Sequence, residues 1–537
     1  MDTLVNATLA AGRALSDTLQ VAAQINEKKW EPWLECENRV LQLNAKLEAE
    51  SNLPAEAEAA LRIERATLLA QMGRSLEARS DYLRVLEFDP ANRSGLIDLG
   101  RLLVSERHLK AAQMVYSEAV KHYPNDIVCR VNLGGVLLER DDYRGSREQY
   151  QAALGIDPEF PQAHGGMYYV LTRLGEFEAA AFHQRKAFGQ KSLFTNPYRG
   201  TAPPIPVLLL VSSTGGNTPL EKLVDDRVFQ TYVVVADFYD TKIPLPAHQI
   251  VINGIGDSDA AKNALLAAES LLAFTQAPVI NIPAAVRATG RCENAVRLAS
   301  LPDVIAPTTA AFTYVQLASA DGTAALAQSG FTFPLLLRAP GFHMGQHFVQ
   351  VDTPADLATT VANLPGAGRP GAELLVIQYL DARGADDCAR KYRVMFVDGR
   401  LYPLHLAISP NWKIHYFSAD MKDRTDHRAE EAQFLTDMQS VLGEKAMAAL
   451  ERVQTALGLD YGGIDFGLNR QGEILLFEAN ATMVVEQPDD DPRWDYRRAA
   501  VARIHAGVRE MLMRNATAVS GKAESRVAVS LAIPAQM

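Results

Sequence analysis

The sequence has few cysteines and no stretch that marks export or membrane insertion. Its four cysteines, Cys36, Cys129, Cys292 and Cys388, stand apart without CxxC or Cys/His spacing, so neither a disulfide framework nor a structural zinc site is expected. The N-terminus lacks a basic segment followed by an apolar one, and no apolar run reaches the roughly 18 residues that span a bilayer. A cytoplasmic location without membrane contact is therefore expected.

Positive charge is also scarce. Asp and Glu number 64 against 53 Lys and Arg, which gives a formal net charge of -11. Such a surface attracts neither nucleic acid nor anionic lipid, so small molecules or proteins are the expected partners. With 537 residues, 48% of them apolar, the chain is long enough for several domains that each have a core.

What the sequence does contain is an internal repeat. Pro90, Pro124 and Pro158 recur every 34 residues. The same spacing separates aromatic, aliphatic and small positions: Tyr82, Tyr116 and Tyr150; Val85, Ala119, Ala153 and Ala187; Ala78, Ala112, Ser146 and Ala180. Small side chains let two helices approach while the aromatic ring fills the gap that they leave, and proline ends the second helix.

The period, the residue types and the Leu-Gly pairs at 99–100 and 133–134 resemble tetratricopeptide repeats, here over residues 59–192. Residues 1–58 are expected to add helices that cap or extend the stack. The resemblance implies an all-α solenoid whose concave surface binds a peptide or protein. The alternative is a module for packing or dimerisation without a ligand groove, which leaves a homodimer open.

The pattern changes after the repeats. Residues 193–204 carry closely spaced prolines and turn formers, which indicates a linker. Short β-branched runs at 206–213 and 231–237 predict buried parallel strands, with a helix over 220–228 between them. This alternation of strand and helix predicts an α/β subdomain over residues 205–307.

The most informative segment is DYGGIDFGLNRQGEILLFEAN, residues 460–480. It predicts two strands joined by a turn, which places Asp465 beside Glu478, with Asn480 two residues further on the same face. Two carboxylates and an amide oxygen suit magnesium, which usually keeps water and takes further oxygens from a nucleotide. The alternative is a surface hairpin with solvated acids. The apolar run 474–477 argues against it, because an unpaired carboxylate leaving a buried strand is costly.

These three residues resemble the magnesium ligands of the ATP-grasp superfamily, whose last strands carry an aspartate, a glutamate and then an asparagine. The resemblance is nearest to the branch of glutathione synthetases and of ligases that add glutamate to a ribosomal protein. It implies an α+β ATP-grasp domain over residues 308–515, preceded by the α/β subdomain. It also implies ATP and Mg2+ as cofactors, with Asp465, Glu478 and Asn480 as the metal ligands.

The resemblance further implies which cations bind phosphate. Arg291 and Arg338 stand where the family places lysines on the ATP phosphates, a replacement that keeps the charge but changes the donor geometry. For Arg291 a plain salt bridge is the alternative. Arg393 matches an arginine that reaches the transferred phosphate, whereas Lys391 replaces the usual acid before it.

The adenosine half of the nucleotide is implied to bind along residues 373–381. Gln378, Tyr379 and Leu380 match the strand whose backbone hydrogen-bonds adenine. An acid that binds ribose should follow, and Asp381 and Asp386 are both candidates.

Two further segments correspond to loops around the substrate. His343 and His347 lie in the loop that closes over the triphosphate, where they contact phosphate or substrate or are simply exposed. Lys413 and His415 follow a predicted hairpin with its turn at 398–399, and they are candidate substrate contacts or part of an exposed strand face.

One residue of the pattern is missing. D-alanine-D-alanine ligase has an arginine two residues before its magnesium aspartate, and this chain has Gly463 there. Arg393 or Lys413 is therefore the expected donor that stabilises the tetrahedral intermediate.

The resemblance implies a ligase that joins a carboxylate substrate to an amine substrate through an acyl phosphate, with ATP and magnesium. Two alternatives stay open: a catalytically weak ATP-binding adaptor that acts through its repeats, and an ATP-grasp phosphotransferase. The identities of the acid and the amine do not follow from the sequence. Residues 516–537 are expected to form a tail of little order.

Overall fold

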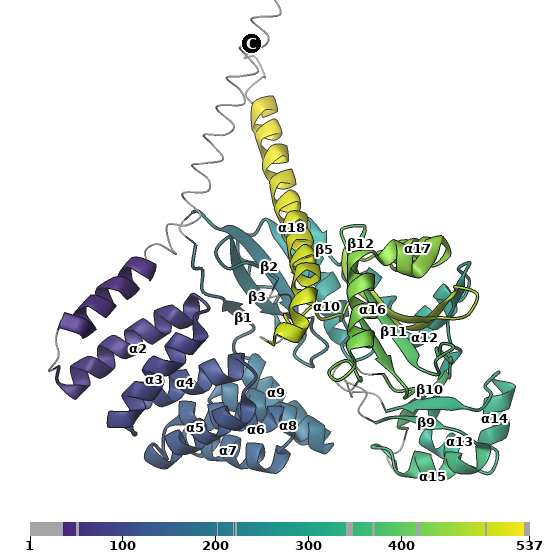
Figure 1. Ribbon diagram of the computed structural model, residues 1–537, viewed down its shortest axis with the longest axis horizontal. Helices are drawn as coiled ribbons and strands as arrows, with labels where there is room; N and C mark the ends of the chain where they lie inside the picture. The colour runs from purple at the N-terminus through teal and green to yellow at the C-terminus, as the bar shows by residue number, and fades with distance from the viewer. Residues whose placement is uncertain are drawn as a thin grey trace, which may run out of the picture. The chain divides into compact units, whose positions relative to one another are not determined.

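The computed structural model describes residues 36–49, 53–200, 202–218, 220, 223–339, 347–367, 371–414, 419–488 and 491–530, with 518–530 described by their backbone alone. The chain divides into two compact units. The first comprises Met1–Ser192 and Tyr198–Pro204, and the second comprises Leu193–Pro197 and Ile205–Met537. In the part of the chain that the structure describes, the first unit is helical and the second contains the strands (Figure 1).

The first unit consists of antiparallel helix pairs. A helix over 36–49 precedes α2 (Ala55–Gln71), α3 (Ser75–Phe88), α4 (Arg93–Ser105), α5 (Leu109–His122), α6 (Ile127–Glu139), α7 (Tyr143–Ile156), α8 (Pro161–Leu174) and α9 (Phe177–Phe188). Helices α3, α5, α7 and α9 begin 34 residues apart, as do α4, α6 and α8. The predicted helical repeats are confirmed, and of the segment 1–58, where further helices were expected, residues 1–35 lie outside the described residues.

The repeated tyrosines explain the repeated glycines. Tyr116 of α5 is 3% exposed and Tyr150 of α7 is 4% exposed. A Cβ atom at Gly100 would lie 2.5 Å from the ring of Tyr116, and one at Gly134 would lie 3.0 Å from the ring of Tyr150. The Leu-Gly pairs are therefore positions where a helix makes room for an aromatic side chain of the next helix.

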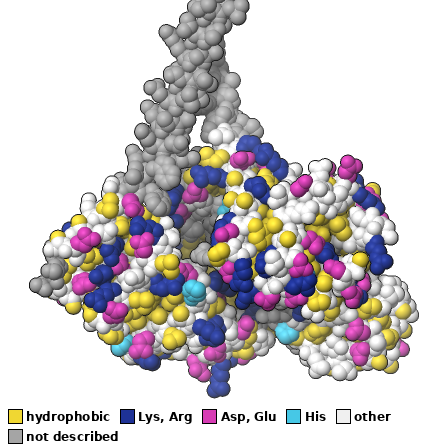
Figure 2. Space-filling model, viewed as in Figure 1, with side chains coloured by type: hydrophobic (Ala, Val, Ile, Leu, Met, Phe, Trp, Pro, Cys, Tyr) yellow, Lys and Arg dark blue, Asp and Glu magenta, His cyan; other side chains and the backbone are white. Residues whose placement is uncertain are grey.

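Charged side chains of both signs are interspersed over the face drawn in Figure 2. In the repeats, several ion pairs join a residue of one repeat to a residue of the following one: Arg79 with Glu106 at 2.5 Å, Arg107 with Glu139 at 2.9 Å and Arg147 with Glu176 at 2.8 Å. Arg79 and Arg147 occupy the same position of α3 and α7 because the repeats share one geometry.

The second unit opens with a five-stranded sheet in the order β1-β3-β2-β4-β5. Its parallel strands are β2 (Ile205–Val211), β3 (Phe229–Val235), β4 (Ile250–Asn253) and β5 (Val279–Ile280), and β1 (Leu193–Thr195) pairs with β3 in the antiparallel sense. The residues predicted to be a linker thus contribute an edge strand. Helix α10 (Lys262–Leu271) lies between β4 and β5 in the chain, and α11 (Pro283–Arg287) and α12 (Arg291–Leu298) follow β5.

The helix expected over 220–228 is wrong over 223–228, where the chain forms turns and bends, whereas Leu220 lies in a 3-10 helix and residues 221–222 fall outside the described residues. The side chain of Asp225 accepts a hydrogen bond from the N–H of Arg227, and its carbonyl accepts from Val228 and Phe229. A local side-chain acceptor of this kind competes with helical hydrogen bonding and turns the chain into β3.

Two more sheets follow. A four-stranded antiparallel sheet in the order β7-β10-β8-β9 is made of β7 (Thr309–Thr313), β8 (Leu335–Arg338), β9 (Phe348–Val351) and β10 (Glu373–Gln378), with the short helices α13 (Tyr314–Ala318), α14 (Gly322–Gln328) and α15 (Leu357–Ala362). A five-stranded sheet in the order β12-β11-β13-β14-β6 is made of β11 (Ala389–Val397), β12 (Arg400–Ser409), β13 (Tyr461–Leu468), β14 (Ile474–Asn480) and β6 (Val304–Ile305). The unit therefore has a mixed α and β architecture.

Three helices accompany the last sheet: α16 (Thr425–Thr436), α17 (Met438–Leu457) and α18 (Asp495–Ser530). Helix α18 continues to Ser530, so the backbone of 516–530 is helical where a tail of little order was expected. Among the residues that can be searched, no helix is both long and apolar enough to span a bilayer.

Candidate functional site

A row of polar side chains crosses four strands of the last sheet. Arg393 on β11 pairs in register with His405 on β12 on one side and with Asp465 on β13 on the other. Asp465 in turn pairs with Glu478 on β14. Register partners share one face of a sheet with their Cβ atoms about 5 Å apart. The prediction that Asp465 and Glu478 lie side by side is confirmed.

Bulges in two hairpins create this row. Phe466 pairs with Leu476 but Asp465 pairs with Glu478, so Phe477 is an extra residue on β14. In a regular ladder without this bulge, Asp465 would pair with Phe477 rather than with Glu478. A second register shift lies beside Arg393, in its pairing with β12. Bulges re-aim side chains and are frequent beside active sites.

Asp465 is enclosed by cations. Its side chain is 4% exposed, and its oxygens accept from Arg393 Nε at 2.5 Å, from the Arg393 terminal nitrogen at 2.8 Å and from Lys391 Nζ at 3.1 Å. Burial raises the pKa of the Asp465 carboxyl, but the charges of Arg393 and Lys391 outweigh it and hold that pKa well below its ordinary value. Asp465 is therefore a carboxylate with both oxygens engaged.

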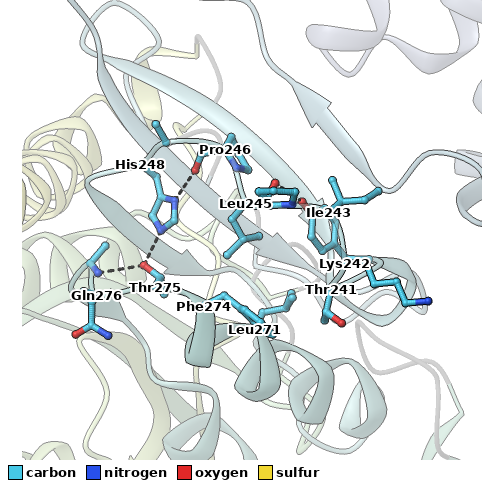
Figure 3. Close-up of a pocket in the computed structure, with 14 residues that line it drawn as sticks. Thr241, Lys242, Ile243, Leu245, Pro246, His248, Leu271, Phe274, Thr275 and Gln276 are labelled. Atoms are coloured by element: carbon cyan, nitrogen blue, oxygen red, sulfur yellow. Dashed lines mark hydrogen bonds between the residues drawn. The ribbon is translucent and has the colours of Figure 1, made fainter.

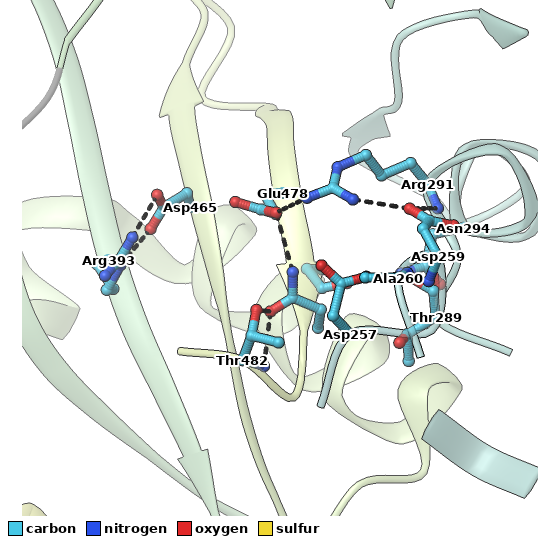
Figure 4. A network of polar contacts seen from close by, with 12 residues as sticks. Asp257, Asp259, Ala260, Thr289, Arg291, Asn294, Arg393, Asp465, Glu478 and Thr482 are labelled. Atoms are coloured by element: carbon cyan, nitrogen blue, oxygen red, sulfur yellow. Dashed lines mark hydrogen bonds and ion pairs between the residues drawn. The ribbon is translucent and has the colours of Figure 1, made fainter. Parts of the chain in front are cut away.

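Glu478 has a different environment (Figure 4). Its Oε1 accepts from Arg291 at 2.8 Å and from the Asn480 amide at 3.0 Å, and Arg291 also contacts Asp259 at 2.7 Å. Burial raises the pKa of Glu478, but the charges of Arg291 and Arg338 outweigh it and leave it lowered. Glu478 Oε2 accepts no hydrogen bond from any residue that the structure describes.

The amide of Asn480 is turned away from a metal position. Its oxygen accepts from the Thr482 N–H at 2.9 Å and from the Thr482 hydroxyl at 2.8 Å, so its NH2 group faces Glu478. A backbone donor fixes this orientation, because the amide nitrogen could not accept from it.

A magnesium ion at this site would meet one open oxygen and several that are already engaged within the protein. The residue types are the oxygen ligands that magnesium prefers, and Glu478 Oε2 is open to such an ion. Asp465 and Asn480, by contrast, already use their oxygens within the protein. Over the described residues, no three His, Cys, Asp or Glu side chains are grouped so that they could hold a metal ion. The residues fit one magnesium ion at Glu478, and Asp465 and Asn480 stay predicted ligands.

Arg338 connects the row to the four-stranded sheet. It lies at the end of β8, where its guanidinium stands 5.9 Å from the ring centre of Phe348. Burial and the charge of Arg291 lower the pKa of Arg338. The charge of Arg338 also acts on Glu478, and its contact with phosphate stays a prediction.

Lys413 lies elsewhere. Its Nζ donates to the carbonyl of Phe348 at 3.1 Å rather than to either carboxylate of the row. The neighbouring Trp412 contacts the ring of Phe348 edge-on at 5.6 Å and that of Tyr379 at 6.5 Å. A catalytic role of Lys413 stays a prediction, and the contacts shown here place it against β9.

The predicted adenine contacts follow the end of β10. The side chain of Gln378 accepts from the Thr332 N–H at 2.9 Å and donates to the Thr332 and Pro334 carbonyls. Gln378 therefore fastens β10 to the start of β8 with its side chain. Tyr379 and Leu380 come next in the chain, and their backbone contact with adenine stays a prediction.

Both candidate ribose acids are held by arginine. Asp381 pairs with Arg383 at 2.8 Å, and Asp386 pairs with Arg390 at 2.9 Å. The hydrogen bond from Arg390 lowers the pKa of Asp386 to about 2. Because Arg390 also binds Glu430 at 2.6 Å, Asp386 belongs to a fixed network, whereas the partners of Asp381 are its chain neighbours Arg383 and Tyr379.

Gly463 leaves no room for the arginine found in D-alanine-D-alanine ligase. A Cβ atom there would lie 2.8 Å from the Val394 carbonyl and 3.0 Å from Met483. Arg393, in the row, is the nearer of the two expected donors to the carboxylates. His343 and His415 fall outside the described residues, and His347 has a left-handed backbone with φ of 50° at the start of β9.

Sequence reasoning missed Asp257 and Asp259, which follow strand β4. Asp257 is 7% exposed, and its Oδ1 accepts from the N–H groups of Asp259 and Ala260. Its charge acts on Arg291 and Arg338, as does that of Asp259. The signal was present: acidic residues that follow two glycines after a buried parallel strand lie at the edge of the sheet where ligands bind.

A cavity of about 650 Å³ lies away from this row (Figure 3). It is lined by the loop 239–248 and by 271–277, at the amino-terminal edge of β4 and β5. Its polar groups are largely satisfied locally, since His248 bonds to the Pro246 carbonyl and to the Thr275 hydroxyl at 2.7 Å each. The row is the better candidate site because it concentrates the buried charges.

The comparisons with known proteins concern the repeats. No family model matches the sequence, and no curated protein matches it either. Among solved structures, MamA from Desulfovibrio magneticus RS-1 is similar at 21% identity, covering 30% of this chain and 88% of that one with a TM-score of 0.27. A tetratricopeptide repeat protein from Parabacteroides merdae is similar at 15% identity, covering 30% and 62% with a TM-score of 0.28. Similarity at this level carries no argument about function, and the helical repeats of this chain are established by its own helix pairs.

Proposed function

We propose that the second unit is an ATP- and magnesium-dependent ligase of the ATP-grasp type, which joins a carboxylate to an amine. The observation that carries the proposal is the register pairing of Asp465 with Glu478, flanked by bulges and surrounded by Arg291, Arg338 and Arg393. Buried acids and cations in such density are costly for a structural sheet and are expected where a polyanion is handled.

In this proposal the arginines bind the nucleotide. Arg291 and Arg338 neutralise the triphosphate, and Arg393 orients the substrate carboxylate for attack on the γ-phosphorus, which forms an acyl phosphate and ADP. Magnesium at Glu478 would supply charge neutralisation to the phosphates. An amine then displaces phosphate from the acyl group, and Arg393 stabilises the oxyanion that develops.

The repeats are proposed to recruit a peptide or protein that carries one of the two substrates. Their support is the solenoid of helix pairs, an architecture that offers an extended binding surface. Free amino acids and peptides with a free carboxyl terminus are therefore both candidate acids.

A second candidate is an ATP-binding adaptor without ligation. It is favoured by the engagement of both Asp465 oxygens and of the Asn480 oxygen inside the protein. Under this alternative the row would bind nucleotide but not transfer phosphate.

Trapping with hydroxylamine separates the two candidates. The full chain is incubated with ATP, Mg2+, hydroxylamine and pools of carboxylates that include peptides, and ADP and hydroxamate are measured. A ligase gives both products with at least one pool, and Glu478→Gln abolishes them. Glu473→Gln, at the turn of the same hairpin and paired with Lys445 at 3.5 Å, is the matched control and keeps them. Absence of hydroxamate from every pool, with ADP release equal in wild type and Glu478→Gln, would refute ligation.

A further inference from the structure

Lys391 places a second positive charge beside the Asp465 carboxylate, in addition to that of Arg393. Its Nζ lies 3.1 Å from Asp465 Oδ2, and its side chain is only 14% exposed. Arg393 binds the same carboxylate with two nitrogens, at 2.5 and 2.8 Å, and is 21% exposed. Two cations thus face one anion, away from bulk water, so Asp465 is already more than neutralised.

A divalent ion at Asp465 would have to displace these contacts. Both carboxylate oxygens are occupied, and an ion bonded to either of them would stand within a few ångströms of two fixed positive charges. Repulsion between like charges at that separation is strong in a site screened from solvent. Lys391 is held close by its own strand, because β11 pairs directly with β13.

Glu478 offers the opposite situation. Its Oε1 is engaged by Arg291 and Asn480, while Oε2 receives no donor from the described part of the chain. Its side chain is 30% exposed, so an ion and its water ligands can reach it. The two acids of the row are therefore unequal, one closed by cations and one open.

We propose that Lys391 and Arg393 take the place of a metal ion at Asp465, so that the site binds one divalent cation, at Glu478, rather than two. The inference rests on the proposed function, because it assumes that the site binds ATP together with the divalent cation. In the nucleotide-bound protein the ammonium group of Lys391 neutralises the Asp465 carboxylate at all times, whereas a second metal ion would do so only while bound.

Counting Mn2+ tests this directly. The full chain is titrated with Mn2+ at saturating adenylyl imidodiphosphate, and free Mn2+ is followed by electron paramagnetic resonance while bound nucleotide is measured in parallel. Wild type binds one Mn2+ per bound nucleotide, and Lys391→Glu binds two. Lys445→Gln, which removes a surface lysine 3.4 Å from Asp303, stays at one. Two Mn2+ per nucleotide in wild type, or one in Lys391→Glu, would overturn the inference.

A nucleotide-free titration separates this inference from the proposed function. Lys391→Glu gains one Mn2+ site at millimolar Mn2+ that wild type lacks, and adding Asp465→Asn removes it again. If nucleotide fails to bind but this site appears, the proposed function is refuted and the role of Lys391 stands. If no site appears in either titration, the role of Lys391 is refuted. The double variant Lys391→Gln with Arg393→Gln, which removes the donors from both oxygens of Asp465, is the alternative should Lys391→Glu not fold, and it also gains a second Mn2+ with nucleotide.

Discussion

The two units of the chain are stabilised in different ways. In the repeats one contact recurs: a buried tyrosine of one helix packs on a glycine of the helix before it, as Tyr116 does on Gly100. In the second unit the important contacts occur once each, between segments far apart in the chain. Arg291 reaches Glu478 across 187 residues. Repetition spreads stability over many equivalent contacts, whereas the site depends on a few that have no substitute.

Their charges differ in the same way. The pair between Arg107 and Glu139 joins two repeats with side chains that are 76% and 42% exposed. Asp465 and Arg393 are 4% and 21% exposed. Exposed pairs contribute little because water screens them, while a buried charge that loses its partner is strongly destabilising. The cost of removing a partner should therefore rise with the burial of the charge that is left behind.

The largest effect is expected from Asp465→Ala. It leaves Arg393 and Lys391 buried without their shared anion, which costs about 3 to 5 kcal/mol for a buried pair. Hydrogen exchange of peptides from β11 and β13, measured by mass spectrometry on the full chain, reports the local free energy of opening. Asp386→Ala is the control, because the side chain of Asp386 is 49% exposed, and it should cost about 1 kcal/mol or less. Equal costs for the two variants would show that the cations around Asp465 relax into water.

A smaller effect is expected from a methyl group in the repeats. At Gly166 on α8 an added Cβ atom would overlap the ring of Tyr150, whereas at the adjacent Gly165 nothing lies within 4 Å of it. Gly166→Ala should therefore destabilise α7 and α8 by about 1 to 3 kcal/mol through overpacking. Gly165→Ala should stabilise α8 by up to about 1 kcal/mol, since alanine favours helix. Hydrogen exchange of the two helices measures both, and a cost at Gly165 equal to that at Gly166 would contradict the packing explanation.

The repeats and the hairpin elements could be predicted from the sequence because their signals are local. The spacing of 34 residues fixes helix starts, and the turn residues Asp398 and Gly399, both with positive φ, fix the β11–β12 hairpin. The pairing of Asp465 with Glu478 was also predicted, although the bulge at Phe477 that produces it was not. The sequence of one strand does not indicate a bulge, because a bulge depends on how that strand pairs with the strand beside it.

The electrostatics of the site could not be predicted. The sequence identifies Asp465 and Lys391 as notable residues, but their contact depends on the register of β11 against β13. It also does not predict that Thr482 takes the oxygen of Asn480. The turns at 223–228 were missed because the Asp225 side chain captures a backbone N–H that a helix would use. These three features depend on which atoms form hydrogen bonds or ion pairs in the folded chain, and residue type alone does not determine that.

The smallest effect is expected at the ion pair between Arg107 and Glu139. A double-mutant cycle with Arg107→Ala and Glu139→Ala should give a coupling energy of about 0.5 kcal/mol or less, since both side chains are largely solvated. The pair between Arg147 and Glu176 joins the next two repeats, with side chains that are 35% and 42% exposed. Its coupling should be slightly larger, because its arginine is better covered, and both should weaken when salt is added. A coupling above about 2 kcal/mol at either pair would mean that the repeats, like the row around Asp465, depend on individual charge contacts.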